Sequence, residues 1–114
     1  MGYKRGSVYL ANLNPSKKSE PGKVRPVLVL QTDLLNDAGH PSTLVMPLTT
    51  NLIDNMRLLR IRVPKRGKLE QDSDLLIDQV RAIDNERFTS GVLAELSGEE
   101  MEKVLELVCK LVGR

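Results

Sequence analysis

Short apolar segments alternate with polar turns along most of the chain, and this pattern predicts a mainly β protein. The continuous apolar run from Pro26 to Gln31 predicts a strand that is buried on both faces. Pro47 indicates that the strand around it lies at a sheet edge or ends nearby. In residues 57–63 the odd-numbered apolar side chains share one face, while Arg60 and Arg62 share the other. The predicted strands cover residues 6–12, 26–31, 43–48, 57–63, 75–83 (bent near positions 78 and 79) and 91–96.

The C-terminal segment predicts an amphipathic helix. Ser97 is a suitable N-cap, and Glu100 three residues later completes a capping box. Apolar residues then recur at three- and four-residue spacing, at Met101, Val104, Leu105, Val108, Leu111 and Val112. Several short strands followed by one terminal helix indicate a mainly β fold, in which a small barrel or strongly coiled sheet is closed by this helix.

A long polar loop is predicted over residues 13–24, which contain two prolines, a glycine and three lysines. A loop of this length in so small a domain is more often functional than idle. It leads directly into Arg25, at the mouth of the buried strand, where Pro26 restricts the arginine to extended geometry. This junction makes Arg25 a candidate functional residue.

Composition removes several classes of site. The chain has 114 residues, and we expect residues 1–114 to form one domain. With one cysteine and one histidine it cannot form an internal disulfide, a zinc site of N and S ligands within one chain, or a pair of catalytic imidazoles. Its three aromatic residues are too few for an RNA surface built on base stacking. Without a signal peptide or an apolar run of membrane-spanning length, we expect a cytoplasmic protein.

The net charge of +2 hides a basic stretch at residues 57–68, which holds four arginines and two lysines and no acid. This is the strongest polyanion signal in the chain. The alternative is a solvated strand and turn whose charges aid solubility. Charge alone does not decide between the two, because a modest patch gives electrostatic affinity without identifying its ligand.

Asp78 is the candidate buried acid, because it lies inside an apolar segment where an unpaired carboxylate is costly. One interpretation is a structural ion pair with Arg25 or Arg81. The other is a site where this carboxylate, a guanidinium and the hydroxyl of Thr49 converge on one phosphate, since a guanidinium binds two oxygens at once. RNA cleavage at such a site would use a carboxylate base and an arginine or lysine that stabilises charge.

Four segments together resemble the MazF/PemK (Kid) family of toxin endoribonucleases, in the family's order and at compatible spacing. They are 5–15, 19–20 with 25–29, 45–50 and 78–84, and they span nearly the whole chain. The resemblance implies an SH3-like or CcdB-like small β-barrel with a C-terminal helix. It also implies a homodimer that binds single-stranded RNA in a groove at the dimer interface, and an acidic antitoxin that covers this groove.

The resemblance further implies cleavage without a metal or other cofactor. The ribose 2′-OH attacks the adjacent phosphate and leaves a 2′,3′-cyclic phosphate and a 5′-OH. By motif position, Arg25 matches the arginine of acid/base catalysis and transition-state stabilisation, and Thr49 the hydroxyl that stabilises the phosphate. Glu20 matches the loop glutamate implicated in some members, and Asp78 matches the carboxylate proposed as the base in Kid-type members. The residues expected to bind RNA beside them are Lys17, Lys18, Ser19, Lys23, Thr50, Asn51, Gln79 and Arg81.

The motif departs from the family at three positions. Pro21 stands where many members have glutamine, Ser19 where Kid-type members have histidine, and Leu76 where they have arginine. The full Kid-type catalytic set is therefore absent, the MazF-type pair of arginine and threonine is intact, and the choice of base stays open. Two alternatives remain: a catalytically inactive member, and a non-enzymatic inhibitor of DNA gyrase, which the same barrel can also host.

Overall fold

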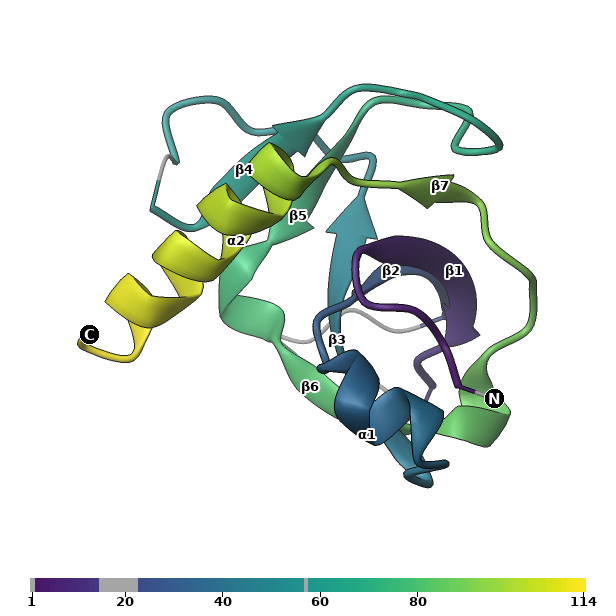
Figure 1. The fold of residues 1–114 in the computed structure, drawn as a ribbon. Coiled ribbons are helices and arrows are strands. Elements are labelled where there is room, and N and C mark those ends of the chain that lie inside the picture. Colours follow the sequence, from purple (N-terminus) through teal and green to yellow (C-terminus); the bar gives the residue numbers. More distant parts are fainter. Residues whose placement is uncertain (1, 15–22, 57) are drawn as a thin grey trace.

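A computed structural model describes residues 2–14, 23–56 and 58–114. The elements in chain order are β1 (Ser7–Asn12), β2 (Val24–Val29), α1 (Asp33–Asp37), β3 (Ser42–Thr49), β4 (Arg60–Val63), β5 (Ser73–Leu76), the 3₁₀ turn η1 (Ile77–Gln79), β6 (Arg81–Asp84), the 3₁₀ turn η2 (Asn85–Arg87), β7 (Ala94–Glu95) and α2 (Gly98–Leu111). The predicted mainly β fold with a C-terminal helix is confirmed (Figure 1).

The described strands form one antiparallel sheet in which β3 is central. The order is β4–β5–β3–β2–β1–β7, and β6 pairs with β3. On one side β3 pairs with β2; on the other it pairs first with β6, through residues 42–45, and then with β5, through residues 48–49. Pro47 therefore does not mark a sheet edge. It lies in the gap where β3 changes partner, so its missing N–H interrupts neither of these last two ladders.

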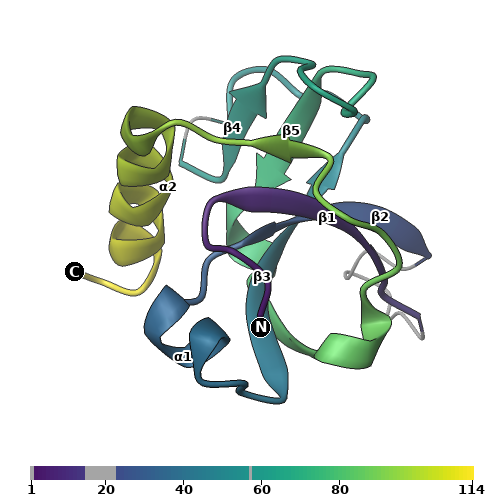
Figure 2. The same cartoon turned by 45° about the vertical axis from the view of Figure 1, so that its right-hand side comes forward.

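One face of the sheet packs against α2, which lies beside β4 and β5 (Figures 1 and 2). The helix contributes Met101 and Val104, at 5% and 0% exposure, and they pack in one cluster with Leu75 and Ile77. The predicted apolar stripe is thus buried in the first half of the helix. At its end the stripe emerges into solvent, where Val112 is 68% exposed.

The opposite face curls into a small ring of β1, β2, β3, β6 and η2 (Figure 2). An isolated β-bridge between Ala11 and Phe88 closes the ring, where the residue after η2 lies against β1. Inside the ring, Tyr3 stacks on Phe88 with ring centroids 3.8 Å apart and meets Tyr9 edge-on at 4.9 Å. All the aromatic side chains therefore lie in this core, which leaves none for a stacking surface.

Two strand predictions are refined by the structure. The segment 75–83 forms no single bent strand; β5 and β6 are separate strands joined by η1, which occupies the predicted bend. The strand predicted over 57–63 begins at Arg60, and Arg57 lies outside the described residues. The face alternation predicted for this strand is confirmed, because Ile61 packs against the core under α2 while Arg60 and Arg62 bond to an acid described below.

The predicted capping box opens α2 and is joined by an arginine. Ser97 Oγ accepts the backbone N–H of Glu100 at 3.1 Å, and Glu100 Oε1 accepts that of Ser97 at 2.8 Å. The same carboxylate accepts two bonds from Arg66, at 2.6 and 2.8 Å. The Arg66 guanidinium is the main cause that lowers the pKa of Glu100 to about 2. Because Arg66 lies in the turn between β4 and β5, this pair ties that turn to the start of α2.

Glu100→Gln is expected to lower the free energy of unfolding at neutral pH by roughly 1–2 kcal/mol. The full pKa shift corresponds to roughly 3 kcal/mol, and solvent at the partly exposed pair screens part of it. Because the pKa of this carboxyl is lower in the folded state, its contribution is present above about pH 5 and is lost as the pH falls toward 2. Urea unfolding of both proteins at neutral pH and near pH 3 measures this loss.

The control for this prediction is Glu99→Gln, which changes the exposed neighbouring carboxylate. The gap in stability between wild type and Glu100→Gln should narrow in acid, whereas the Glu99 variant should stay close to wild type at both pH values. If the free energies of unfolding of wild type and Glu100→Gln differ equally at both pH values, the lowered pKa of Glu100 does not stabilise the fold.

Candidate active site

Strands β2 and β3 separate at one end, and the gap between them is the candidate active site. In the described chain their ladder ends at the pair Val27 and Pro47, although both strands continue further. Pro26 and Pro47 lie at this point, and each lacks the N–H that a longer ladder would use. A hollow of about 220 Å³ opens there, which we call the notch. The residues that line it include Lys23, Arg25, Leu48, Thr50 and Ser73.

Arg25 and Thr49 flank the notch from its two strands. Arg25 lies in β2, lines the notch and is half-buried. Thr49 ends β3 between two lining residues, Leu48 and Thr50. The Thr49 Oγ1 accepts the backbone N–H of Asn51 at 3.1 Å, which leaves the hydroxyl proton to donate elsewhere. The structure therefore places Arg25 in the wall of the hollow and Thr49 between two of its lining residues, although Thr49 itself does not line it.

Lys23 fixes the point where the long loop enters β2. Its φ of 64° is left-handed, which costs a non-glycine residue roughly 1–2 kcal/mol. Its N–H donates to Asn14 Oδ1 at 2.8 Å, and its carbonyl accepts the N–H of Leu13 at 2.9 Å. These bonds stabilise the strained backbone at the rim of the notch. The other predicted residues of this loop, Lys17, Lys18, Ser19 and Glu20, lie outside the described residues.

A buried carboxylate, Asp74, lies beside Thr49 in the sheet. The two residues pair in the β3–β5 ladder, and Asp74 is 1% exposed. Its Oδ1 accepts Arg62 Nε at 2.6 Å, and its Oδ2 accepts Arg60 Nη1 at 3.2 Å and the backbone N–H of Ile53 at 3.0 Å. Asp74 therefore holds two arginines of β4 together with the loop that follows Thr49.

The same two arginines hold further points of the loop 51–56. Arg60 Nη1 donates to the Asn51 carbonyl at 2.7 Å, and Arg62 Nη2 donates to Asp54 Oδ1 at 2.9 Å. Each guanidinium thus joins a β4 position to the loop. The loop that follows Thr49 is therefore braced by a charged cluster, while Thr49 itself is held by its pairing with β5.

Asp74 is ionised in this cluster although it is buried. Burial by itself raises the pKa of this carboxyl, but the bonds from Arg62, the Ile53 amide and Arg60 together hold the pKa below its usual range. The sequence analysis did not single out this residue. The available signal was the pair of arginines on one strand face, which calls for an acid at the start of the neighbouring strand.

Such pairs hold three of the six basic residues of the stretch 57–68. Its arginines at positions 60, 62 and 66 each pair with a carboxylate, of Asp74 or Glu100. The structure therefore does not support a continuous polyanion patch, because the fold brings Asp74 and Glu100 against three of its arginines. Within the described part of the chain, Lys65 and Lys68 have no ion pair.

Asp78 is not the buried, paired acid that the sequence predicts. It lies in η1 with Gln79, is exposed, and forms no ion pair with a described residue. The reason is the turn between β5 and β6, which brings the side chain out of the sheet. Arg81 begins β6, and its Nη1 is buried without a hydrogen-bond partner. The predicted pairing of this acid with Arg25 or Arg81 is therefore wrong.

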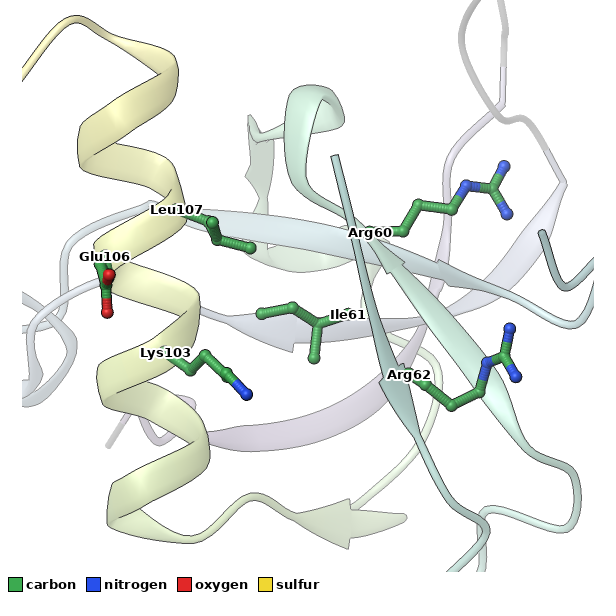
Figure 3. A pocket seen from close by; sticks show the side chains of 6 residues that line it. All are labelled: Arg60, Ile61, Arg62, Lys103, Glu106 and Leu107. Atoms are coloured by element: carbon green, nitrogen blue, oxygen red, sulfur yellow. The ribbon is translucent and has the colours of Figure 1, made fainter. Parts of the chain in front are cut away.

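A larger hollow of about 420 Å³ lies between β4 and α2 (Figure 3). Ile61 and Leu107 point into it from the strand and the helix, with Lys103 beside them. The side chains of Arg60 and Arg62 point away from the helix. None of the described residues that the sequence predicts for the site lines this hollow.

The notch offers donors for an anion. Lys23 and Arg25 supply positive charge, and Thr50 and the neighbouring Thr49 supply hydroxyls, a combination that suits a phosphate. Among the described residues, no group of three or more His, Cys, Asp or Glu side chains could hold a metal ion. In the same part of the chain, no helix has the length and apolar character needed to cross a membrane.

Comparison with known proteins gives a family match over most of the chain. The model of the family described as PemK-like, MazF-like toxin of type II toxin-antitoxin system matches residues 4–112. Endoribonuclease EndoA of Bacillus subtilis (strain 168) is 39% identical over 104 residues, which cover 90% of this chain and 88% of EndoA.

Solved structures share the fold at low sequence identity. MazF of Deinococcus radiodurans (Form-I) superposes with a TM-score of 0.84 at 21% identity, covering 100% of this chain and 99% of that one. A MazE–MazF structure from the same organism (Form-II) gives 0.75 at 18% identity, covering 99% and 97%. An endoribonuclease in complex with its cognate antitoxin from Mycobacterial species gives 0.73 at 16% identity, covering 96% and 93%.

Proposed function

The chain belongs to the PemK-like, MazF-like toxins of type II toxin–antitoxin systems and is an endoribonuclease, and from this premise we propose that it cuts single-stranded mRNA at specific sequences without a metal ion and so inhibits translation and growth. The observation that carries the proposal is the notch, which Arg25 and Thr49 flank. The alternative of a gyrase inhibitor finds no support, because the curated relative is an endoribonuclease.

In the proposed reaction the ribose 2′-oxygen attacks the adjacent phosphorus, and the bond from phosphorus to the 5′-oxygen breaks. The products are a 2′,3′-cyclic phosphate and a 5′-OH. A carboxylate takes the 2′-OH proton, and the departing 5′-oxygen takes a proton from a water molecule. The Arg25 guanidinium donates to the non-bridging phosphate oxygens as negative charge builds on them, and the Thr49 hydroxyl adds a neutral donor.

We assign the base to Glu20 rather than to Asp78. A general base must come within hydrogen-bond reach of the proton it takes. Glu20 precedes Lys23 by three residues in the sequence, and Lys23 lines the notch. Asp78 lies in η1, which follows the end of β5. The β5 residue that pairs with Thr49 is Asp74, four residues before Asp78.

We propose a homodimer as the working unit, in the cytoplasm, with a cognate acidic antitoxin as its inhibitor. Structural neighbours include a MazE–MazF structure and an endoribonuclease bound to its cognate antitoxin. The exposed apolar end of α2, at Leu111 and Val112, is a surface that a partner would cover. The RNA contacts assigned from sequence, at Lys17, Lys18, Ser19, Lys23, Thr50, Asn51, Gln79 and Arg81, belong to the same proposal.

Purified protein incubated with a long single-stranded RNA in EDTA is expected to cut it at a small set of sites. End mapping should find 5′-OH ends, which accept phosphate from a kinase, and cyclic phosphates on the other side of each cut. A preparation of Arg25→Ala made in parallel shows whether a contaminating nuclease is present. The absence of cleavage, or cleavage that appears only when a divalent metal is added, would overturn the mechanism. A supercoiling assay should show no inhibition of gyrase.

A further inference from the structure

A hollow of about 620 Å³ lies beside the notch, against the turn that joins β4 to β5. Leu10, Pro26 and Leu93 form an apolar wall, and Lys68, Glu70 and Gln71 form a polar rim. The three rim residues are exposed. We call this hollow the Lys68 groove. Its volume is within the range of pockets that hold small organic ligands.

The Lys68 groove continues the notch. The two hollows share Pro26, Thr50 and Ser73 in their walls. Thr50 belongs to both walls and directly follows Thr49 in the chain, so the groove lies directly beside the proposed phosphate site. The groove is thus placed to receive a nucleotide that neighbours the cleaved phosphate.

The wall that carries Lys68 is held firmly in place. The Lys68 N–H donates to the Leu93 carbonyl at 2.7 Å, and Arg66 and Leu69 exchange backbone bonds of 3.1 and 2.8 Å. Gly67 permits this approach, because its φ is +54° and a Cβ there would lie 2.8 Å from the Leu93 oxygen. The backbone of the turn is therefore ordered before any ligand binds, which lowers the entropy cost of binding.

We propose that the Lys68 groove is an RNA subsite that binds a nucleotide adjacent to the cleaved phosphate. The ammonium of Lys68 contacts a backbone phosphate, and the apolar wall takes the flat face of the base. Gln71 and Glu70 meet the base edge, where the carboxylate accepts a bond from an amino group. Glu70 finds a hydrogen-bond donor in the amino group of a base, which the acidic side chains of a peptide do not offer, so the lining favours a nucleotide. This inference rests on the proposed function.

The charge of Lys68 distinguishes it from the arginines of the same segment. Those at positions 60, 62 and 66 pair with carboxylates, whereas Lys68 has no ion pair among the described residues. Lys65 is a matched control. It lies in the same turn, is exposed and carries the same charge, but it does not line the groove, and its N–H is bonded to Asp72 Oδ1 at 2.8 Å.

The test compares Lys68→Ala with Lys65→Ala on an RNA oligonucleotide centred on one mapped cleavage site. A copy with a 2′-hydrogen at the cleaved ribose binds without reacting, and fluorescence anisotropy measures its affinity over a range of salt. We expect Lys68→Ala to weaken binding roughly fivefold and to lower the salt slope by about 0.7, as for one lost phosphate contact on a single strand. On the cleavable oligonucleotide KM should rise by a similar factor with kcat unchanged. Lys65→Ala should match wild type.

Truncated oligonucleotides locate the effect. When nucleotides are removed from the side that fills the groove, wild type and Lys68→Ala should bind equally, whereas truncation on the other side should preserve the difference. Equal affinity of the two lysine variants for the full oligonucleotide would overturn the subsite. So would a loss of poly-glutamate binding in Lys68→Ala with RNA binding unchanged, which would assign the groove to an acidic peptide. If the wild type cleaves no RNA, the proposed function itself fails, and the subsite falls with it.

Discussion

Alanine in place of Arg25 is expected to lower the rate of RNA cleavage by at least about 10²–10³-fold, because it removes the charged donor nearest to the phosphate that reacts. Arg25 lines the notch from β2. Its guanidinium can hold two phosphate oxygens and gains strength as charge develops on them. Initial rates on an oligonucleotide with one mapped cleavage site measure the loss, and circular dichroism with thermal unfolding checks that the fold is retained.

Two further variants test what the Arg25 guanidinium contributes beyond its positive charge, and whether the loss is specific to this position. Arg25→Lys keeps the positive charge but loses the planar pair of donors, so we expect an intermediate rate. Arg5→Ala removes an exposed arginine that precedes β1, whereas the notch lies beside the opposite end of β1, and this variant should cleave at the wild-type rate. Cleavage by a folded Arg25→Ala protein within about threefold of wild type would remove Arg25 from the mechanism.

Asp74→Ala is expected to lower the free energy of unfolding by about 3–5 kcal/mol, the usual cost of removing one partner from a buried ion pair. The substitution leaves Arg60, whose side chain is 16% exposed, without its ion-pair partner, and it frees the N–H of Ile53. The loop beside Thr49 should loosen at the same time. Urea unfolding measures the stability, and cleavage mapping measures whether the loosened loop changes the preferred RNA sites.

The control for Asp74 is Asp54→Ala. Asp54 also pairs with Arg62, but it is 83% exposed, so its loss should cost at most about 0.5–1 kcal/mol. Asp74→Asn keeps the side-chain volume and one acceptor and should fall between the two. Equal stability of the Asp74 and Asp54 alanine variants would show that the buried cluster does not brace the loop.

The cluster around Asp74 has a second consequence for the site. Because β2 and β3 separate at the notch, each strand keeps there only the ladder on its other side, β2 with β1 and β3 with β5. The bonds of Asp74, Arg60 and Arg62 add to this ladder on the β3 side, at Asn51 and Ile53. On the β2 side, the bonds of Lys23 to Leu13 and Asn14 do the same. An open notch between two braced rims is therefore compatible with a stable sheet.

Local sequence predicted the strands and the helix well, because they depend on short-range periodicity. The apolar run from Pro26 became a central strand, and the capping box at Ser97 opens α2 as expected. The ion pairs of the basic stretch and the exposure of Asp78 were harder to predict, since both depend on which other segments pack around these residues. Whether an arginine pairs with an acid or faces solvent follows from cross-strand register, which no single window of sequence contains.

By itself, the sequence determined the mainly β fold with its terminal helix, the resemblance to toxin endoribonucleases, and the candidate pair Arg25 and Thr49. Each of these follows from residue order, spacing and motif. Only the tertiary structure decided that Asp74, and not Asp78, is the buried acid, and that a groove adjoins the notch with a lysine that has no ion pair among the described residues. The physical reason is that burial and ion pairing are set by which strands become neighbours and in what register, and these are properties of the folded chain.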